Sequence, residues 1–559
     1  MMGTISDKLM RIINTKEDIR QALISKGYDV PTSMPFKEYA KMISDLPCRV
    51  DSFPDIEGIV ARYSALGLTN EQMAANPVWV DKTGNAHDLQ LKNFAWSGMS
   101  GVGGYSDENH LTFYKFTLDD YVFMAIKPGV KHMNFTFRVT GLQPGNKLTL
   151  TFFGTTNTVY GTWDKDGIYT VNSAVVEVGK PVYFYNGYGA TRGEFTIEIL
   201  PLYPGALVFD GVDDYGVCDN FPILTKEKGY TVVVLRQWDQ DFLNTTLTGG
   251  LLSTRNYSTG EGVAFEKIES SNKGYWDLGA GGIIDFAKSP FTWQTSKQYN
   301  NVGILKGDKN HGKPLCVGCG LSGGQQCGRF AIWELVFLDH DATEEELTKI
   351  KDYFVKTYPW LFPDQAWTVV GKTNEDEDRA TIANITGNGN DLVLSNFGFA
   401  EGSGYNEEGE YAGYLVTDGV DDKIISSIFK MGNDWTVIGD WELINTGKND
   451  NAGIVKFDSI VIYNYNSMLI NIKNGRNILI PDQNTVNAIC SDGRIYSKDW
   501  KESIYNEETE STSKNFLTIG YSGNAYTKIA FKNLAIYPTV LSREDCIKAY
   551  NYLQTLKAK

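Results

Sequence analysis

The sequence contains little proline, histidine or cysteine, with 17 Pro, 5 His and 7 Cys among 559 residues. The scarcity of proline excludes collagen-like and proline-rich disordered chains, and seven scattered cysteines are too few for a scaffold built on disulfides. The histidines lie far apart and no Gly-x-Ser-x-Gly segment occurs. Because no nucleophilic or metal-dependent hydrolytic site is visible, we expect that the protein is not an enzyme.

Basic residues are also few, at 52 Lys plus Arg against 68 Asp plus Glu, which gives a net charge of -16. No basic cluster offsets this charge, so we expect no nucleic-acid partner. No stretch approaches the ~20 apolar residues of a membrane span, and the first residues lack the apolar run of a signal peptide. These absences predict that the protein does not insert into a membrane. They also predict that it is assembled in a cytoplasm.

Glycine and aromatic residues are abundant, with 56 Gly and 71 aromatic side chains (12 Trp, 31 Tyr, 28 Phe). This composition is typical of many short strands joined by tight turns. Domains of roughly 100–200 residues are usual, so the length predicts about three to five of them.

The sequence around Cys316-Val-Gly-Cys319 has the spacing of metal ligands. With Cys327 and His311 it could form a tetrahedral zinc site. The segment is Gly-rich, however, and no second Cys-x-x-Cys follows. We therefore favour ordinary reduced cysteines over zinc and predict no metal site.

Residues 4–45 have helical periodicity and fall within a helical segment predicted at 1–48. Ile5, Leu9 and Ile12 recur at helical spacing, and Thr15-x-x-Asp18 resembles the cap of a second helix. Such short helices are unstable alone, so they pack on the rest of the chain, on a partner or on copies of themselves.

After residue 48 the pattern changes to short strands, and the chain contains an internal repeat. Thr-Gly-Asn-x-x-Asp-Leu stands at 83–89 and 386–392, and Asp-Gly-Val-Asp-Asp stands at 210–214 and 418–422. Each copy ends in a strand followed by a helix-capping sequence. The capping sequences are Thr343-x-x-Glu346 and Ser542-x-x-Asp545.

The spacing between these anchors differs between the copies. Phe94 precedes Asp210 by 116 residues, whereas Phe397 precedes Asp418 by 21, so the first copy carries about 95 additional residues. Alternating residues such as those of 133–139 predict strands within this insert. The sequence therefore predicts four parts. They are a helical segment at 1–48, a split sandwich at 49–104 and 205–360, an inserted antiparallel β-sandwich at 105–204, and a second sandwich at 361–559.

The segment Phe209–Tyr215, followed by the strand and capped helix of 332–358, resembles the laminin-G/concanavalin-A-like jelly-roll family, and 417–556 resembles it likewise. The resemblance implies a mainly β fold with two such jelly rolls. Lectins, glycosidase accessory modules and purely structural domains share this fold, so it implies little about function.

The N-terminal segment 14–22, with Lys26-Gly27 and 34–39, is similar to the start of tail, fibre and other virion proteins of tailed phages. The Thr-Gly-Asn-x-x-Asp-Leu repeat resembles proteins of phages of gut Bacteroidales, including crAss-like phages. The resemblance implies a head or tail fibre or decoration protein on the virion surface. Its N-terminal helices would contact other virion proteins, its β domains would adhere to a host glycan or surface protein, and its assembly would be a homo-oligomer, with a trimer favoured.

Aromatic residues are candidates for ligand binding because their side chains can stack on sugars. The candidates are Tyr275 and Trp276 in the first repeat and Tyr183, Tyr185 and Tyr188 in the insert. The alternative is that they are core or cross-strand aromatics, which strands favour anyway.

The Asp-Gly-Val-Asp-Asp segments could supply carboxylates to calcium, although a turn that accepts backbone N–H bonds is the simpler role. No Glu-x-Asp-x-Glu strand of a jelly-roll glycosidase occurs, and the acidic run 375–378 is better interpreted as a solvated loop.

A bacterial carbohydrate-binding or accessory adhesion protein without a virion role is the alternative function, and an enzyme with an unrecognised site is a third.

Overall fold

The computed structural model describes a large part of the chain. The described residues are 16, 20, 52–96, 101–102, 113–116, 121–124, 132–142, 145–152, 158–175, 182–186, 195–224, 229–239, 242, 246–254, 264–267, 273–277, 282–285, 302–305, 314–321, 325–407, 411–427, 432–444, 453–457, 460–464, 468–472, 476–480, 486–497, 500, 502–504, 517–522 and 525–558. The predicted helical segment at 1–48 lies outside them, except for Lys16 and Arg20, which are helical. The chain divides into the units 1–55 and 56–559, and the second contains all the sheets.

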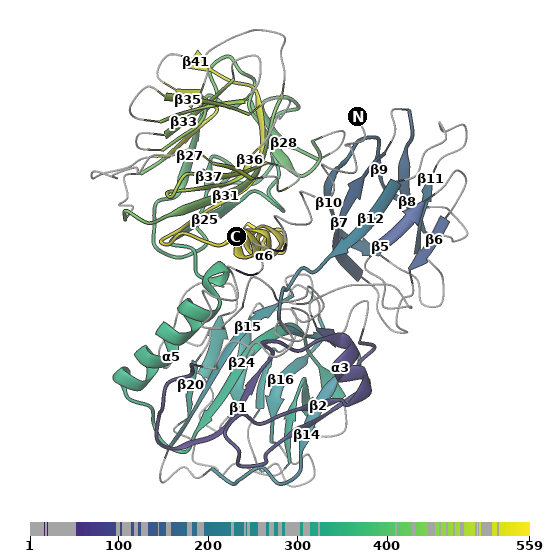
Figure 1. Cartoon of the computed structure of the whole chain (residues 1–559), viewed down its shortest axis with the longest axis vertical. Helices are drawn as coiled ribbons and strands as arrows, with labels where there is room; N and C mark the ends of the chain where they lie inside the picture. The colour runs from purple at the N-terminus through teal and green to yellow at the C-terminus, as the bar shows by residue number, and fades with distance from the viewer. Residues whose placement is uncertain are drawn as a thin grey trace. The chain divides into compact units, whose positions relative to one another are not determined.

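A first sandwich is built from strands of two separate stretches of the chain (Figure 1). One sheet has the order β20-β15-β24-β13-β4, with β1 also paired to β24, and comprises β1 (Ile59–Ser64), β4 (Gly101–Val102), β13 (Leu207–Asp210), β15 (Tyr230–Trp238), β20 (Val302–Leu305) and β24 (Arg329–Leu338). The other has the order β19-β18-β17-β16-β21-β14-β3-β2, with the pair β22-β23 beside β16. It comprises β2 (Val78–Trp79), β3 (Leu89–Lys92), β14 (Tyr215–Cys218), β16 (Gly249–Ser253), β17 (Ala264–Lys267), β18 (Lys273–Asp277), β19 (Gly282–Asp285), β21 (Leu315–Val317), β22 (Cys319–Leu321) and β23 (Gln325–Cys327).

Aromatic side chains fill the space between these two sheets. Tyr63 of β1 and Trp79 of β2 are fully buried, with ring centroids 5.5 Å apart. Phe94, which follows β3 of the other sheet, packs edge-on against Phe209 of β13 at 5.1 Å, and Phe209 stacks on its neighbour in the same sheet, Phe330 of β24, at 4.7 Å. Because large aromatic side chains remove much apolar area from water, this packing holds the two sheets together.

A second pair of sheets lies between β4 and β13 in the chain. Its sheets have the orders β10-β7-β12-β5 and β6-β11-β8-β9 and comprise β5 (Phe113–Phe116), β6 (Tyr121–Met124), β7 (His132–Thr140), β8 (Leu148–Phe152), β9 (Thr158–Trp163), β10 (Gly167–Val175), β11 (Val182–Asn186) and β12 (Phe195–Leu200). All their pairings are antiparallel. Phe137 of β7 packs edge-on against Trp163 of β9 at 4.8 Å, so the two sheets share a core.

A further sandwich follows residue 364 and is likewise made of two antiparallel sheets. The sheet β28-β29-β42-β31-β36-β37-β38, with β25 beside β42, comprises β25 (Gln365–Thr368), β28 (Gly404–Asn406), β29 (Tyr414–Val416), β31 (Thr436–Leu443), β36 (Val486–Cys490), β37 (Arg494–Ser497), β38 (Glu502–Ile504) and β42 (Ile529–Tyr537). The sheet β26-β27-β30-β39-β32-β33-β34-β35 comprises β26 (Thr381–Ile382), β27 (Leu392–Ser395), β30 (Lys423–Ser426), β32 (Gly453–Phe457), β33 (Ile460–Asn464), β34 (Met468–Ile472), β35 (Arg476–Ile480) and β39 (Leu517–Ile519), and a hairpin joins β40 (Tyr521–Ser522) to β41 (Ala525–Tyr526). Because it is the second copy of the repeat, we call it the second sandwich, and we call the pair of sheets between β4 and β13 the insert.

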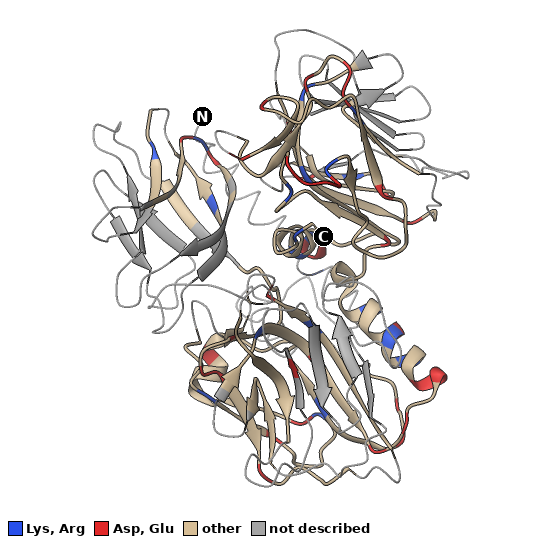
Figure 2. Cartoon of the chain, turned by 180° about the vertical axis from the view of Figure 1, so that it is seen from behind, with Lys and Arg blue, Asp and Glu red and all other residues tan. Residues whose placement is uncertain are grey.

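The described helices are few and short. They are α3 (Asn70–Ala75), α5 (Glu344–Thr357), the 3-10 turn η1 (Pro359–Leu361) and α6 (Arg543–Leu553). Thr343 and Glu346 cap α5 reciprocally, and Ser542 caps α6 through the N–H of Asp545. Both capping predictions are confirmed. Figure 2 shows the acidic first turn of α5, where negative charge complements the helix dipole.

The observed architecture is mainly β and consists of sandwiches whose strand pairings are antiparallel, apart from the parallel contact of β16 with β23, which confirms the predicted fold class. The two sandwiches of the repeat also match in detail. The register of β15 on β24 shifts between Leu235 and Arg236, and that of β31 on β42 shifts between Asp440 and Trp441. Among the described residues, no helix is long and apolar enough to cross a membrane.

Candidate functional site

Each sandwich of the repeat carries an acidic loop of the same sequence. Residues 210–214 connect β13 to β14, and residues 418–422 lead into β30. Gly211 and Gly419 both have φ of 76°, a conformation that favours glycine. A Cβ on Gly211 would lie 2.7 Å from that of Arg329, so the loop has no space for a larger residue there.

The aspartates of the second loop hold its backbone. Asp418 Oδ1 accepts the N–H groups of Val420 at 2.7 Å and Asp421 at 3.2 Å. The N–H of Asp418 donates to Asp422 Oδ2 at 2.7 Å. The first loop has the same bonds. Asp210 Oδ1 accepts the N–H groups of Val212 and Asp213, and the N–H of Asp210 donates to Asp214 Oδ2. These bonds confirm the turn-forming role expected for both segments.

The same loops concentrate carboxylate oxygens. In each loop one oxygen from each of three aspartates lies within 4.8 Å of the others, a donor set that suits calcium. Asp422 is buried and accepts a hydrogen bond from Ser403 Oγ at 3.1 Å. Burial, together with the neighbouring Asp418 and Asp421 charges, raises the pKa of Asp422 to about 6. Asp210, Asp213, Asp214, Asp418, Asp421 and Asp422 are thus the residues that could hold a cation.

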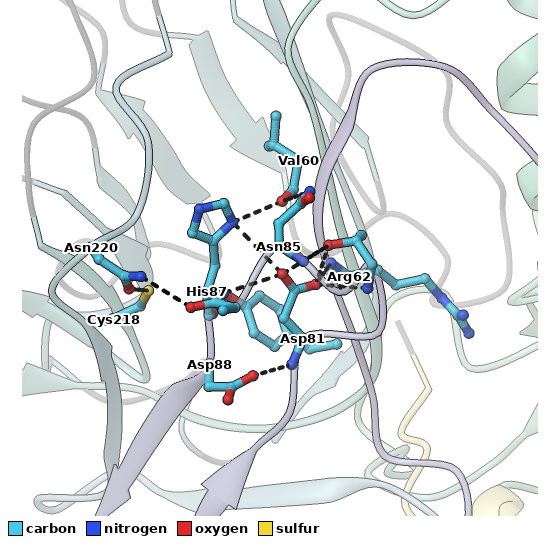
Figure 3. A network of polar contacts seen from close by, with 11 residues as sticks. Val60, Arg62, Asp81, Asn85, His87, Asp88, Cys218 and Asn220 are labelled. Atoms are coloured by element: carbon cyan, nitrogen blue, oxygen red, sulfur yellow. Dashed lines mark hydrogen bonds and ion pairs between the residues drawn. The ribbon is translucent and has the colours of Figure 1, made fainter.

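The Thr-Gly-Asn loop of the first sandwich is organised around Asp81 (Figure 3). Its Oδ1 accepts the N–H of Arg62 and the N–H of Thr83, both at 3.0 Å. Its Oδ2 accepts the N–H of His87 at 3.3 Å, and its own N–H donates to Asp88 Oδ1 at 2.8 Å. Asp81 is 4% exposed, so this carboxylate joins β1 to the loop from inside the protein.

Asn384 makes the equivalent hydrogen bonds in the Thr-Gly-Asn loop of the second sandwich. Its Oδ1 accepts the N–H of Ala366 at 3.2 Å and that of Thr386 at 3.0 Å, and its own N–H donates to Asp391 Oδ1 at 2.8 Å. Sequence reasoning missed Asp81 and Asn384. The signal that could have found them is a shared Asp or Asn two positions before the Thr of each loop.

The two sandwiches bury ion pairs at different positions. In the first, Arg62 Nη2 lies 3.2 Å from Glu334 Oε2, and Tyr358 O–H donates to Glu334 Oε1 at 2.7 Å. In the second, Lys532 Nζ lies 3.9 Å from Asp440 Oδ2. Burial lowers the pKa of Lys532, while the Asp440 charge opposes that change.

The predicted sugar-stacking aromatics fall in two different sandwiches. Tyr275 and Trp276 lie in β18, opposite Glu266 and Phe265 of β17. Tyr183 and Tyr185 lie in β11, opposite Thr151 and Thr149 of β8. The side chains of these four residues and the whole of Tyr188 lie outside the described residues, so their role in binding stays a prediction.

The expectation of reduced cysteines is wrong for one pair. Cys319 and Cys327 are opposite each other on β22 and β23 and form a disulfide. Cys316 remains a buried thiol, and burial raises its pKa to about 12. The Cys-x-x-Cys spacing failed as a guide because the hairpin brings Cys327 opposite Cys319. His311, the fourth member of the zinc alternative, lies outside the described residues.

Comparisons with known proteins give no family. No family model matches the chain, and no curated protein matches its sequence. Among solved structures, the binding domain of botulinum neurotoxin serotype D is 11% identical with a TM-score of 0.24, over 60% of this chain and 89% of that one. A Trypanosoma rangeli sialidase in complex with 2,3-difluorosialic acid is 9% identical with a TM-score of 0.24, over 74% of this chain and 61% of that one. At such low scores neither likeness bears on what this chain binds or does.

Proposed function

We propose that the chain is a virion surface appendage of a tailed phage, a head or tail fibre or decoration protein, which presents its β domains for adhesion to a host surface. In this proposal the N-terminal helices attach the protein to other virion proteins. The assembly is a homo-oligomer, with a trimer favoured, and the protein has no catalytic role.

The observation that supports adhesion best is the duplication of one sandwich with its loops. Asp81 and Asn384 hold equivalent loops, as do Asp210 and Asp418. Two tethered copies of a weak binding surface bind a repetitive target far more tightly than one copy does, because the second contact is intramolecular. A host glycan coat is a repetitive target of this kind. Loops held rigidly by their own side chains lose little entropy on binding.

Adhesion is tested with the full chain on a glycan array and on host cells. We expect binding, with a loss of tenfold or more in Tyr275→Ala or Trp276→Ala. Val393, which is half exposed in β27, provides a matched control, and Val393→Ala should bind as the wild type does. Equal binding by all the variants contradicts the assignment of Tyr275 and Trp276. Absence of binding to any host surface contradicts adhesion itself.

The virion role is tested separately by particle incorporation. A chain that begins at residue 49 should fold and yet be absent from purified particles, whereas the full chain is incorporated. Full incorporation of the shortened chain excludes attachment through residues 1–48, and absence of the full chain from particles excludes the virion role.

A further inference from the structure

A lysine, an aspartate and a tyrosine of the second sandwich form a polar cluster across three adjacent strands. Lys532 Nζ of β42 lies 3.9 Å from Asp440 Oδ2 of β31. Tyr414 of β29 donates its O–H to Asp440 Oδ1 at 3.0 Å, and Lys532 Nζ lies 5.7 Å from the centre of the Tyr414 ring. The strands are neighbours in the order β29-β42-β31. We call these three residues the lysine cluster.

The lysine cluster lies on the face of its sheet that points away from the apolar core, yet it is shielded from water. The adjacent residues Leu415, Phe531 and Trp441 belong to the core. Because strand residues alternate between the two faces, the cluster lies on the other one. Helix α6 packs against β31 and β42 and covers that face. The lysine and aspartate side chains are therefore only 9% and 16% exposed.

The first sandwich has apolar residues at all three positions of the cluster. The shared register shift of β31 on β42 and of β15 on β24 aligns Phe531 with Ile332. On the other side of these central strands, Leu415 of β29 is opposite Phe531. Leu207 of β13 is opposite Ile332 in the same way. The residues equivalent to Asp440, Lys532 and Tyr414 are Leu235, Trp333 and Ala206, respectively, and all three are buried.

The comparison shows that the fold does not require charges at these positions. Burial of two opposite charges costs about as much free energy as their attraction returns, and apolar residues of similar volume are often more stabilising. The separation of 3.9 Å between Lys532 Nζ and Asp440 Oδ2 is also longer than a hydrogen bond. As an ion pair this contact is poor. As a meeting of an amine with a carboxyl group away from water, it suits a condensation.

We propose that Lys532 and Asp440 join in an isopeptide bond, an intramolecular amide that links β42 covalently to β31. Burial lowers the pKa of Lys532, although the Asp440 charge opposes that change, and a lowered pKa favours the neutral amine that the reaction requires. The bond replaces two buried charges by one neutral amide, and the exclusion of water protects the product from hydrolysis.

The chemistry requires only the residues of the lysine cluster. The Lys532 ammonium first passes one proton to Asp440 Oδ2, and the neutral Nζ then attacks the Asp440 carboxyl carbon, which forms the C–N bond. The Tyr414 O–H stabilises the negative charge that develops on Oδ1, the oxygen that stays in the amide. The bond from carbon to Oδ2 breaks, and Oδ2 leaves as water with the two protons that nitrogen has lost. One ammonium and one carboxylate thus give one amide and one water molecule.

The test measures the mass of the full chain under denaturing and reducing conditions, after several days at neutral pH. We expect a mass lower than that of the sequence by one water molecule, and a branched peptide that joins the segments of Lys532 and Asp440. A chain of full mass overturns the proposal. A water molecule lost within one linear peptide, as in the cyclisation of Asp418 onto Gly419, overturns it as well.

Lys372 and Asp378 provide a matched control within the same chain. Their Nζ and Oδ1 atoms are 2.6 Å apart, closer than the atoms of the proposed bond, but the Asp378 side chain is 65% exposed. Because water stabilises this carboxylate in its charged form, we expect the two peptides to remain unlinked. A cross-link at this pair as well contradicts the proposal that a buried site drives the reaction.

Variants of the cluster test the roles of its members. Tyr414→Phe removes the O–H on Asp440 and should reduce the linked fraction tenfold or more. Tyr405→Phe, which removes an O–H donated to the Arg379 carbonyl at 2.7 Å, should leave the linked fraction unchanged. Lys532→Met with Asp440→Leu makes the site apolar, as it is in the first sandwich, and should fold and have its full mass. Loss of water in this double variant overturns the proposal, and equal linkage in Tyr414→Phe and the wild type contradicts the role of Tyr414.

Discussion

Arg62 and Glu334 form a buried ion pair between β1 and β24 although 272 residues separate them in the sequence. The register of β25 on β42 places Ala366 and Asn533 at the equivalent positions. The second sandwich thus maintains the same strand pairing without this charge pair. The ion pair is therefore a feature of one copy, not a requirement of the fold.

Removal of Arg62 alone should be costly. Arg62→Ala leaves the Glu334 carboxylate buried with an uncompensated charge and should lower the free energy of unfolding by about 3–5 kcal/mol. Arg62→Ala with Glu334→Asn copies the second sandwich and should lose less than the sum of the two single changes, with a coupling of about 1–3 kcal/mol. Denaturant unfolding of all four proteins measures this coupling. Strictly additive losses contradict it.

Asp81 should be replaceable by asparagine but not by alanine. Asp81→Ala leaves the buried N–H of Arg62 without its acceptor, at a cost of about 2–3 kcal/mol. Asp81→Asn keeps one oxygen and is the residue that the second sandwich uses, as Asn384, so its cost should be below about 1 kcal/mol. Thermal unfolding distinguishes the two variants. Equal losses in both show that the charge, rather than the acceptor, holds the loop.

The features that follow local rules could be predicted from the sequence. The mainly β fold class, the acidic turns and the helix caps at Thr343 and Ser542 depend on residues within a few positions of one another. The role of Asp81 could not be predicted, because it depends on the backbone of Arg62, which another strand brings near. The Cys319–Cys327 disulfide depends likewise on hairpin register. Contacts between distant segments are fixed by packing, which a single sequence does not display.

The stability of the second sandwich should depend on pH through Asp422. Burial raises the pKa of Asp422 from its ordinary 3.8 to about 6, so the folded state binds this proton more tightly than the unfolded state does. The cost of the ionised carboxylate is therefore fully present above about pH 6 and disappears as the pH falls to about 4. Asp422→Asn should be more stable than the wild type at pH 7.5 by about 1 kcal/mol, a value reduced for solvent screening, and equally stable near pH 4.

The measurement is chemical unfolding of the wild type and Asp422→Asn at several pH values. Asparagine can still accept the N–H of Asp418 and donate to Ser403 Oγ, so the variant tests charge rather than shape. Glu375→Gln removes an exposed charge that does not contribute to the pKa shift of Asp422 and serves as the control for a general effect of net charge. A gain in Asp422→Asn that persists unchanged at pH 4 contradicts the assignment.

Replacement of Asn533 by an apolar residue should stabilise the second sandwich. Its side chain is fully buried in β42, and neither its Oδ1 nor its Nδ2 has a hydrogen-bond partner among the described residues. Each unsatisfied buried polar atom costs about 1–3 kcal/mol, and leucine has nearly the same shape. Asn533→Leu should therefore raise the free energy of unfolding by about 1–3 kcal/mol.

The matched control makes the same chemical change at an asparagine with partners. Asn384→Leu removes the acceptor of the Ala366 and Thr386 N–H groups and should destabilise the protein by about 2–3 kcal/mol. Opposite signs for these two variants in denaturant unfolding indicate that hydrogen bonding, rather than hydrophobicity, decides the outcome. A loss of stability in both contradicts an unsatisfied amide at Asn533, because a bound water or an unrecognised partner would then satisfy it.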